Sequence, residues 1–306
     1  MPYDKVALIG FGEAGPVFAR AFLDAGVGRV SAYDILIDDP ATAAAQRNKT
    51  EALGVEAAAS PAQAVRDAAL IVSTVTADQT VVAAENVAPS LRPGQIYLDL
   101  NSTSPRVKRL AADAVEIAGA SFVEGVAMDT VPNFGARVPI LVSGPTAEGL
   151  VGELNALGMR LECVGPSLGQ ASSAKMLRSV LIKGFAALFA ESMIAATKLG
   201  LESRVIGSLA VTFPGLDWEK EVAYYLGRSA IHAKRQAAEM CASAETVRDL
   251  GVEPLMTEAA AARLQWAADL DLAEHYDAGE APTVAGYARA VAAAERARKS
   301  RGQGRA

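Results

Sequence analysis

The chain has 306 residues, of which 51% are hydrophobic and 21% are charged, and its formal net charge is −6. This composition excludes an extended disordered protein, and the length accommodates two domains with separate cores. Because binding to nucleic-acid phosphates requires a basic face, the acidic balance argues against nucleic acid as a partner. The basic cluster RKSRGQGR at residues 298–305 is expected to be a solvated tail.

Features of compartment and membrane association point to a cytoplasmic protein. The two cysteines, Cys163 and Cys241, form no CxxC motif, so neither a disulfide framework nor a metal site is expected. The N-terminus runs into a strand without the basic and apolar regions of a signal peptide. The most apolar long stretch, residues 180–199, contains three charged side chains, which favours a buried helix over a membrane span.

The first predicted strand, residues 6–9, leads directly into a glycine-rich turn and then a helix. Such a turn permits a tight bend, lets the backbone approach a pyrophosphate, and presents a helix N-terminus to the anion. The strand, the turn and the helix in this order predict a dinucleotide site, although a purely structural turn has the same composition. The predicted cofactor contacts in the turn are Gly10, Phe11, Gly12, Glu13, Ala14 and Gly15.

The second predicted strand, residues 29–33, ends at an acidic residue, Asp34. A carboxylate at this point can accept the ribose hydroxyls of the adenosine half and would repel a 2′-phosphate, so NAD is preferred and NADP remains possible. Two alternatives stay open. Asp34 can instead cap the next turn, and Arg47 or Lys49 can fold back towards a 2′-phosphate.

Strand and helix patterns continue to alternate up to about residue 163, which predicts right-handed βαβ crossovers and a largely parallel sheet. After Gly169 the strand signals stop, and a long helix over residues 170–199 is followed by further helices, one of them after Pro254. The fold class is therefore α/β, a Rossmann domain over 1–164 and then an all-α domain over 165–298, with a basic tail at 299–306. The further strands are predicted at 70–75, 96–100, 122–126, 139–143 and 161–164.

The order of motifs resembles the β-hydroxyacid dehydrogenase family, which includes 3-hydroxyisobutyrate and 6-phosphogluconate dehydrogenases. VSTVTAD at 72–78 resembles the strand and loop that pass the cofactor, and LDLNSTSP at 98–105 resembles the segment beside the nicotinamide. The resemblance implies cofactor contacts from these two segments and a substrate contact from the second, Ser102. The implied cofactor residues are Thr74, Val75, Thr76 and Asn101.

GPSLGQASSAKMLRS at 165–179 resembles the family's catalytic stretch, which implies that Lys175 is the general acid and base on the substrate hydroxyl. Lysine suits this role because desolvation and nearby charge can lower its pKa towards neutrality. A solvated surface lysine is the alternative for any single position in a helix. Lys183, about 80 degrees further round the helix, is the rival residue.

Two segments depart from the family pattern. Arg178 and Ser179 stand where family members have paired asparagines; Ser179 shares a helix face with Lys175, and Arg178 can hold an anion or pair with a surface acid. The expected substrate loop is EGVAMDT at 124–130 and lacks the usual serine and glycine contacts to a carboxylate. Its predicted substrate residues, Met128, Asp129 and Thr130, indicate a reshaped and partly apolar pocket.

The segment AIHAKR at 230–235, followed by Glu239 and Met240, resembles a branch of the family whose C-terminal domain has no assigned function. His232 is predicted to contact substrate, with packing on a helix surface as the alternative. The resemblance also implies a homodimer formed through this domain. Residues 180–199, Trp218, Tyr224 and Tyr225 can supply an interface, and a role in the core is equally compatible.

Together these residues predict a cytoplasmic, NAD-dependent dehydrogenase that transfers a hydride to or from the hydroxyl carbon of a 3-hydroxy acid or sugar-acid-like alcohol. Decarboxylation of the product stays open. Imine reduction is an alternative, against which Lys175 counts because the related imine reductases usually carry another proton donor there. A non-catalytic NAD(H) sensor is the third possibility, based on the altered segment 124–130.

Overall fold

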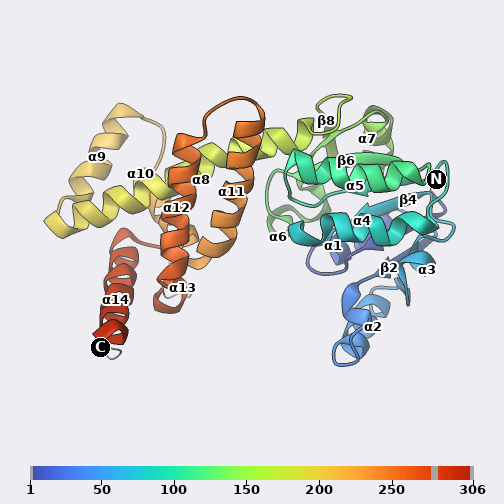
Figure 1. Ribbon diagram of the computed structural model, residues 1–306, viewed down its shortest axis with the longest axis horizontal. Helices are drawn as coiled ribbons and strands as arrows, with labels where there is room; N and C mark the ends of the chain where they lie inside the picture. The colour runs from blue at the N-terminus through green and yellow to red at the C-terminus, as the bar shows by residue number, and fades with distance from the viewer. Residues whose placement is uncertain (1–2, 277–281, 304–306) are drawn as a thin grey trace. The chain divides into compact units, whose positions relative to one another are not determined.

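The computed structural model describes residues 3–276 and 282–303 and divides into two compact units between Lys175 and Met176. The division lies eleven residues beyond the domain boundary expected at 164/165. The reason is local, since backbone groups at the start of the long helix hydrogen-bond Glu124 of the first unit. The first unit is α/β and the second is all-helical, as the sequence predicts (Figure 1).

The first unit is built on a sheet whose described strands run in the order β3-β2-β1-β4-β5-β6-β7-β8. All neighbouring pairs are parallel except β6 and β7, which are antiparallel. Each predicted strand is confirmed, and the two-residue β3 was not predicted. The bounds are β1 (Lys5–Ile9), β2 (Arg29–Tyr33), β3 (Glu56–Ala57), β4 (Leu70–Ser73), β5 (Ile96–Asp99), β6 (Ser121–Ala127), β7 (Pro139–Ser143) and β8 (Arg160–Cys163).

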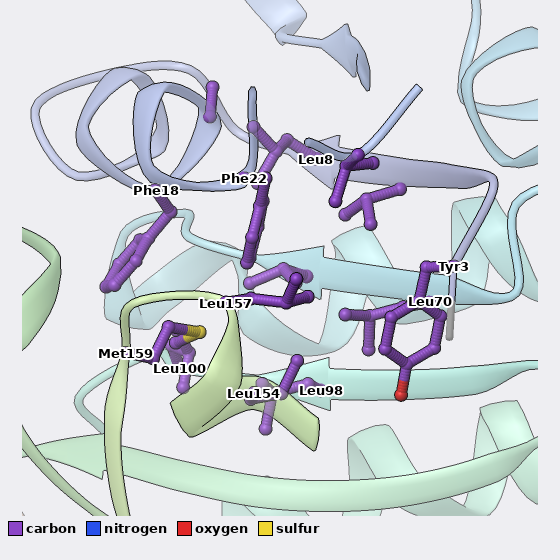
Figure 2. Packing of buried hydrophobic residues seen from close by; sticks show 14 of the residues in the cluster. Tyr3, Leu8, Phe18, Phe22, Leu70, Leu98, Leu100, Leu154, Leu157 and Met159 are labelled. Carbon is purple, nitrogen blue, oxygen red and sulfur yellow. The ribbon is translucent and has the colours of Figure 1, made fainter. Parts of the chain in front are cut away.

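Helices cover both faces of this sheet, because successive side chains of a buried strand point to opposite faces. Leu8 packs with α1 and α7 on one face, where Phe18 and Phe22 of α1 point towards the strands (Figure 2). Its neighbour Ile9 packs with α3, α4 and α5 on the other face. The helices are α1 (Gly15–Asp24), α2 (Ala43–Glu51), α3 (Pro61–Val65), α4 (Thr80–Val87), α5 (Pro105–Ile117), α6 (Val131–Phe134) and α7 (Ala147–Ala156).

The strand order reverses direction between β1 and β4. From β1 the chain continues outwards through β2 and β3, and it then returns to place β4 on the other side of β1. The carboxyl ends of the parallel strands share one edge of the sheet, and in open α/β sheets ligands bind in the crevice at such a reversal. The segments after β1, β2, β4, β5 and β6 all meet this edge.

All of the regular secondary structure described in the second unit is helical. Its main core gathers around Met193, Leu226 and Tyr287, and a smaller one around Met240 and Leu264. Because α14 continues to Gln303, residues 299–303 of the predicted tail are helical, while 304–306 lie outside the described residues. The helices are α8 (Gln170–Leu199), which starts in the first unit, α9 (Glu202–Thr212), α10 (Trp218–Ile231), α11 (Ala233–Asp249), α12 (Leu255–Asp269), α13 (Leu272–His275) and α14 (Val284–Gln303).

Helix α8 is less buried than the sequence predicts. Only 28% of its most apolar 18-residue window is buried, and Leu181, Phe185 and Leu188 are exposed. By length and composition it is the one helix among those described that is long and apolar enough to cross a membrane. The expectation of a buried helix over 180–199 is therefore wrong for one side of α8. The three exposed side chains recur at intervals of three and four residues, so they form one uncovered stripe along the helix.

Candidate functional site

The three glycines of the turn after β1 meet different surroundings. Gly10 has φ of 93°, and a Cβ there would lie 2.6 Å from the carbonyl oxygen of Thr74. A Cβ on Gly15 would lie 2.5 Å from the carbonyl oxygen of Gly10. A Cβ on Gly12 would meet no protein atom within 4 Å. Gly10 and Gly15 are therefore needed for the close packing of backbone segments within the protein. Gly12 faces open space, which leaves room for a ligand.

A cavity of about 310 Å³ opens beside this turn at the carboxyl edge of the sheet. Apolar side chains of β1, α4 and the segment after β2 form much of its wall, and a nucleoside can be enclosed by such a mixture of apolar walls and few polar groups. The predicted cofactor residues that line it are Gly10, Gly12, Asp34, Thr74, Val75 and Thr76.

The remaining predicted cofactor residues lie outside that lining. Phe11 is fully buried in the core, Gly15 is buried in the first turn of α1, and Ala14 is half-buried. Glu13 is exposed. Asn101 lies at the end of β5 and is described below.

Asp34 follows β2, lines the cavity and hydrogen-bonds the backbone of the glycine turn. Its Oδ2 accepts the backbone N–H of Phe11 at 2.6 Å, and its Oδ1 accepts that of Leu36 at 3.0 Å. The bond to Leu36 caps the short turn after β2, which was the structural alternative for this residue. Each carboxylate oxygen can accept a second hydrogen bond, so the same side chain also fits ribose hydroxyls in the cavity that it lines.

Helix α2 is attached to the backbone of the glycine turn. Gln46 Nε2 donates to the carbonyl of Phe11 at 3.2 Å, and Lys49 Nζ donates to the carbonyls of Phe11 and Gly12 at 2.8 and 2.7 Å. Arg47 is exposed. Lys49, one of the two residues considered for a 2′-phosphate, therefore holds the turn through its carbonyl groups.

A buried ion pair lies behind Asn101 and was not predicted. Lys108 and Asp99 have no exposed side-chain surface, and Lys108 Nζ bonds Asp99 Oδ1 at 2.8 Å and the carbonyl of Gly125 at 3.0 Å. Asp99 Oδ1 also accepts the backbone N–H of Asn101 at 2.8 Å, and Asn101 Nδ2 donates to Ser73. Burial raises the pKa of the Asp99 carboxyl, and Lys108 lowers it.

Asn101 Oδ1 is buried and has no hydrogen-bond partner among the described residues. A buried acceptor without a partner is costly, so this atom fits a donor on a ligand. The sequence does contain an indication that Lys108 is buried. It occupies the first position of a helical repeat, 108, 111, 112 and 115, whose other members are apolar and buried.

The expected substrate loop starts as a strand. Glu124 to Ala127 belong to β6, and Glu124 is fully buried, so only the last three residues of that segment follow the strand. There Asp129 Oδ1 accepts the backbone N–H of Thr130 at 2.7 Å, and Met128 is half-buried. Ser102, also half-buried, follows the neighbouring strand β5. The fold thus brings these four predicted substrate residues to one edge of the sheet.

Lys175 lies in the second turn of α8, is half-buried, and is the last residue of the first unit. The other predicted substrate residues lie in the helical unit. Ser179 is buried and accepts a hydrogen bond from Lys183 Nζ at 3.0 Å, whereas Arg178 is exposed. Lys183, the rival base, is also paired with Glu239 at 2.8 Å.

His232 joins α10 to α11 near the same ion pair. Burial lowers the pKa of its imidazole, and Arg228 and Arg235 lower it further, while Glu239 opposes them. Arg235 lies 3.7 Å from Glu239, the partner of Lys183. Ser179 and His232 thus share one polar cluster within this unit. Among the described residues no group of three or more His, Cys, Asp or Glu is placed to hold a metal ion.

Two family models match the chain. Residues 5–129 match the NAD binding domain of 6-phosphogluconate dehydrogenase, and residues 196–267 match a domain of unknown function. The first match covers β1 to the end of β6, which includes the glycine turn, Asp34 and the cavity. The second lies wholly in the helical unit.

Solved structures resemble the chain over nearly its whole length. A conserved hypothetical protein from Sinorhizobium meliloti is 39% identical over 95% of this chain and 96% of its own, with a TM-score of 0.79. A conserved protein of unknown function, described as similar to 3-hydroxyacid dehydrogenases, is 30% identical over 87% and 97%, with a TM-score of 0.72. The 3-hydroxyisobutyrate dehydrogenase of Mycobacterium tuberculosis, 18% identical over 94% and 98% with a TM-score of 0.71, shares the fold.

Proposed function

Because this chain belongs to the β-hydroxyacid dehydrogenase family, we propose that it is an oxidoreductase that uses NAD to interconvert a 3-hydroxy acid, or a related sugar-acid-like alcohol, and its carbonyl compound. The observation that carries this proposal is the cavity beside the glycine turn. Its lining combines an open Gly12 and a carboxylate at the end of β2. Outside that lining, after the strand β5 of the same sheet, Asn101 carries an acceptor that has no partner among the described residues.

The cofactor preference follows from charge. Asp34 lines the cavity where the adenosine ribose binds in this fold, and its carboxylate would repel a 2′-phosphate. Lys49 bonds the carbonyls of Phe11 and Gly12 and so is engaged elsewhere. NAD is therefore the proposed cofactor, with NADP as the weaker ligand.

A bound nicotinamide ring supplies the redox chemistry by accepting or donating a hydride. In oxidation of the alcohol, Lys175 in its neutral form takes the hydroxyl proton, and in reduction its ammonium returns that proton to the carbonyl oxygen. Ser102, Met128, Asp129 and Thr130 orient the substrate from the sheet edge. In the helical unit, Arg178, Ser179 and His232 stay predicted substrate residues, and the guanidinium of Arg178 has the charge that would bind a carboxylate.

The test is turnover measured as nicotinamide absorbance at 340 nm against 3-hydroxy acids, sugar acids and imines. Lys175→Ala should lower kcat by two to four orders of magnitude and keep its affinity for NAD, since general acid–base groups contribute about 10²- to 10⁴-fold. Lys198→Ala, an exposed lysine of the same helix, is the matched control. Unchanged turnover in Lys175→Ala would reject the base, and NAD binding without turnover on any substrate would favour the sensor.

The uncovered stripe of α8 supports a second proposal, that the chain forms a homodimer. Leu181, Phe185 and Leu188 are exposed on one side of the helix, and Phe185 stacks on Phe189 within an aromatic group that includes Trp218. A patch of this kind is expected at an interface. Light scattering should give a dimer for the wild type and a monomer for Leu181→Glu/Phe185→Glu. A monomeric wild type that partitions into liposomes would reject the dimer and favour a membrane contact.

A further inference from the structure

A buried carboxylate lies at the start of α8, and the chemistry proposed above does not use it. Glu124 has no exposed surface, and its two side-chain oxygens accept four hydrogen bonds. Oε1 accepts the Ser143 hydroxyl at 2.6 Å and the backbone N–H groups of Ala171 and Ser172 at 2.9 and 3.2 Å. Oε2 accepts the Ser172 hydroxyl at 3.0 Å. These donors offset the cost of burying the charge.

The two backbone groups come from the first turn of a 30-residue helix, where N–H groups have no partner inside the helix. A carboxylate at this end is also favoured by the helix dipole. Lys175 lies four residues after Ala171 and three after Ser172, so it is a helix-surface neighbour of each, at about 6 and about 4.5 Å along the axis for a rise of 1.5 Å per residue. The contact with Glu124 therefore lies one turn before the proposed base.

Gly125, the residue after Glu124 in β6, is linked by hydrogen bonds to the loop that carries Asn101. The carbonyl of Gly125 accepts a hydrogen bond from Lys108, which also bonds Asp99, and Asp99 accepts the backbone N–H of Asn101. Adjacent residues of one strand thus hold the start of α8 and the loop that carries Asn101. All of these groups belong to the first unit, whose internal geometry is compact.

We propose that Glu124 is a positioning residue, which fixes the first turn of α8 and thereby the place of the Lys175 amine relative to the cofactor edge of the sheet. The inference rests on the proposed role of Lys175. Displacements of about 1 Å can cost about 100-fold in rate, so loss of this anchor should appear in kcat. Glutamine at this position keeps an oxygen for the two N–H groups and can donate its amide to the Ser172 hydroxyl, so geometry is retained without the charge.

The first test measures Lys175 itself and needs no substrate. Acetylation by an amine-reactive ester is followed by mass spectrometry, together with hydrogen exchange of the peptide over residues 170–176. Glu124→Ala should change the Lys175 acetylation rate at least threefold and speed amide exchange in that peptide. Glu124→Gln and the control Glu162→Gln, at an exposed site on β8, should leave both unchanged. Lys198, exposed on the same helix, is the internal reference.

The second test is kinetic. Glu124→Ala should lower kcat per NAD-binding site about 10- to 100-fold with little change in KM or NAD affinity, and Glu124→Gln should recover most of that loss. If Glu124→Ala folds poorly, Ser172→Ala keeps the Oε1 contacts and removes the hydroxyl bonds to Oε2 and to the carbonyl of Gly169. It should give smaller changes of the same sign. Wild-type labelling and exchange in Glu124→Ala, or equal losses in the Ala and Gln variants, would overturn the proposal. Full activity of Lys175→Ala would instead reject the proposed base, and labelling would still decide the role of Glu124.

Discussion

Replacing Lys108 by methionine isolates the contribution of the buried ion pair in the α/β unit. Methionine has similar length and no charge, so the change keeps most of the packing of the side-chain stem on α5. It removes the hydrogen bonds to the Asp99 carboxylate and to the carbonyls of Asp99 and Gly125. What remains for the Asp99 side chain is the backbone N–H of Asn101, because its Oδ2 has no partner within the described chain.

The expected cost is set by the carboxylate that stays behind. Removing one partner of a fully buried pair typically destabilises a protein by about 3–5 kcal/mol, because the other charge is left uncompensated. That is a large part of a typical unfolding free energy of about 5–15 kcal/mol. Arg106→Met, an exposed site on the same helix, should cost less than about 0.5 kcal/mol and is the matched control.

The sign of the pH dependence provides a second check. Burial raises the pKa of Asp99 in the folded protein, and without Lys108 nothing comparable opposes that rise. The penalty is absent below the unfolded pKa of about 4, where Asp99 is neutral in both states, and grows as the pH rises towards the folded value. The deficit of Lys108→Met should therefore be largest at neutral pH and shrink as the pH falls.

Two optical signals separate the units in a urea titration. Both tryptophans, Trp218 and Trp266, lie in the helical unit, so their fluorescence reports that unit, whereas far-ultraviolet circular dichroism reports both. Lys108→Met should move the circular-dichroism transition to lower urea. A free energy within 0.5 kcal/mol of wild type at pH 7, or a deficit that grows on acidification, would refute the role assigned to the pair.

Three further outcomes follow from the cofactor cavity and the helical unit. Asp34→Asn should raise the NADP-to-NAD preference in calorimetry about 5- to 30-fold, since a charge facing a phosphate is worth about 1–2 kcal/mol there; an unchanged ratio contradicts this. Gly12→Val should keep the wild-type melting temperature and lose NAD affinity at least tenfold, whereas Gly10→Val should also lower the melting temperature, because its Cβ meets backbone. Burial and Arg228 lower the pKa of His232 in the folded protein, so the imidazole is protonated in the unfolded chain before it is protonated in the folded one. The helical unit should therefore lose stability as the pH falls below about 6.5, and His232→Gln should reduce this pH dependence.

The pattern of the chain predicts the sheet well for a physical reason. Buried parallel strands need short apolar runs, and the glycines that permit a tight turn leave a visible spacing, so β1 and the turn after it are readable in advance. Strand β3 pairs over two residues only, Glu56 and Ala57, which is too short for a periodic signal.

The polar groups inside the first unit are harder to predict. Lysine and glutamate are usually exposed, so the residue types of Lys108 and Glu124 do not by themselves predict burial. Those partners, Asp99 and the start of α8, come from other elements of the chain. The exposure of α8 has a related cause, since apolar periodicity predicts an amphipathic face but not what covers it.

Helix α2 is held differently from its neighbours. The two residues it buries, Gln46 and Thr50, are polar, and Gln46 and Lys49 join it to carbonyl groups of the glycine turn. Because α2 buries little apolar surface, we expect its local opening to cost less free energy than that of the other helices in this unit. The amides of α2 should exchange with deuterium faster than those of α1, and their exchange should slow when a cofactor binds at the turn. The exchange rate of α2 would therefore report whether the cofactor site is occupied.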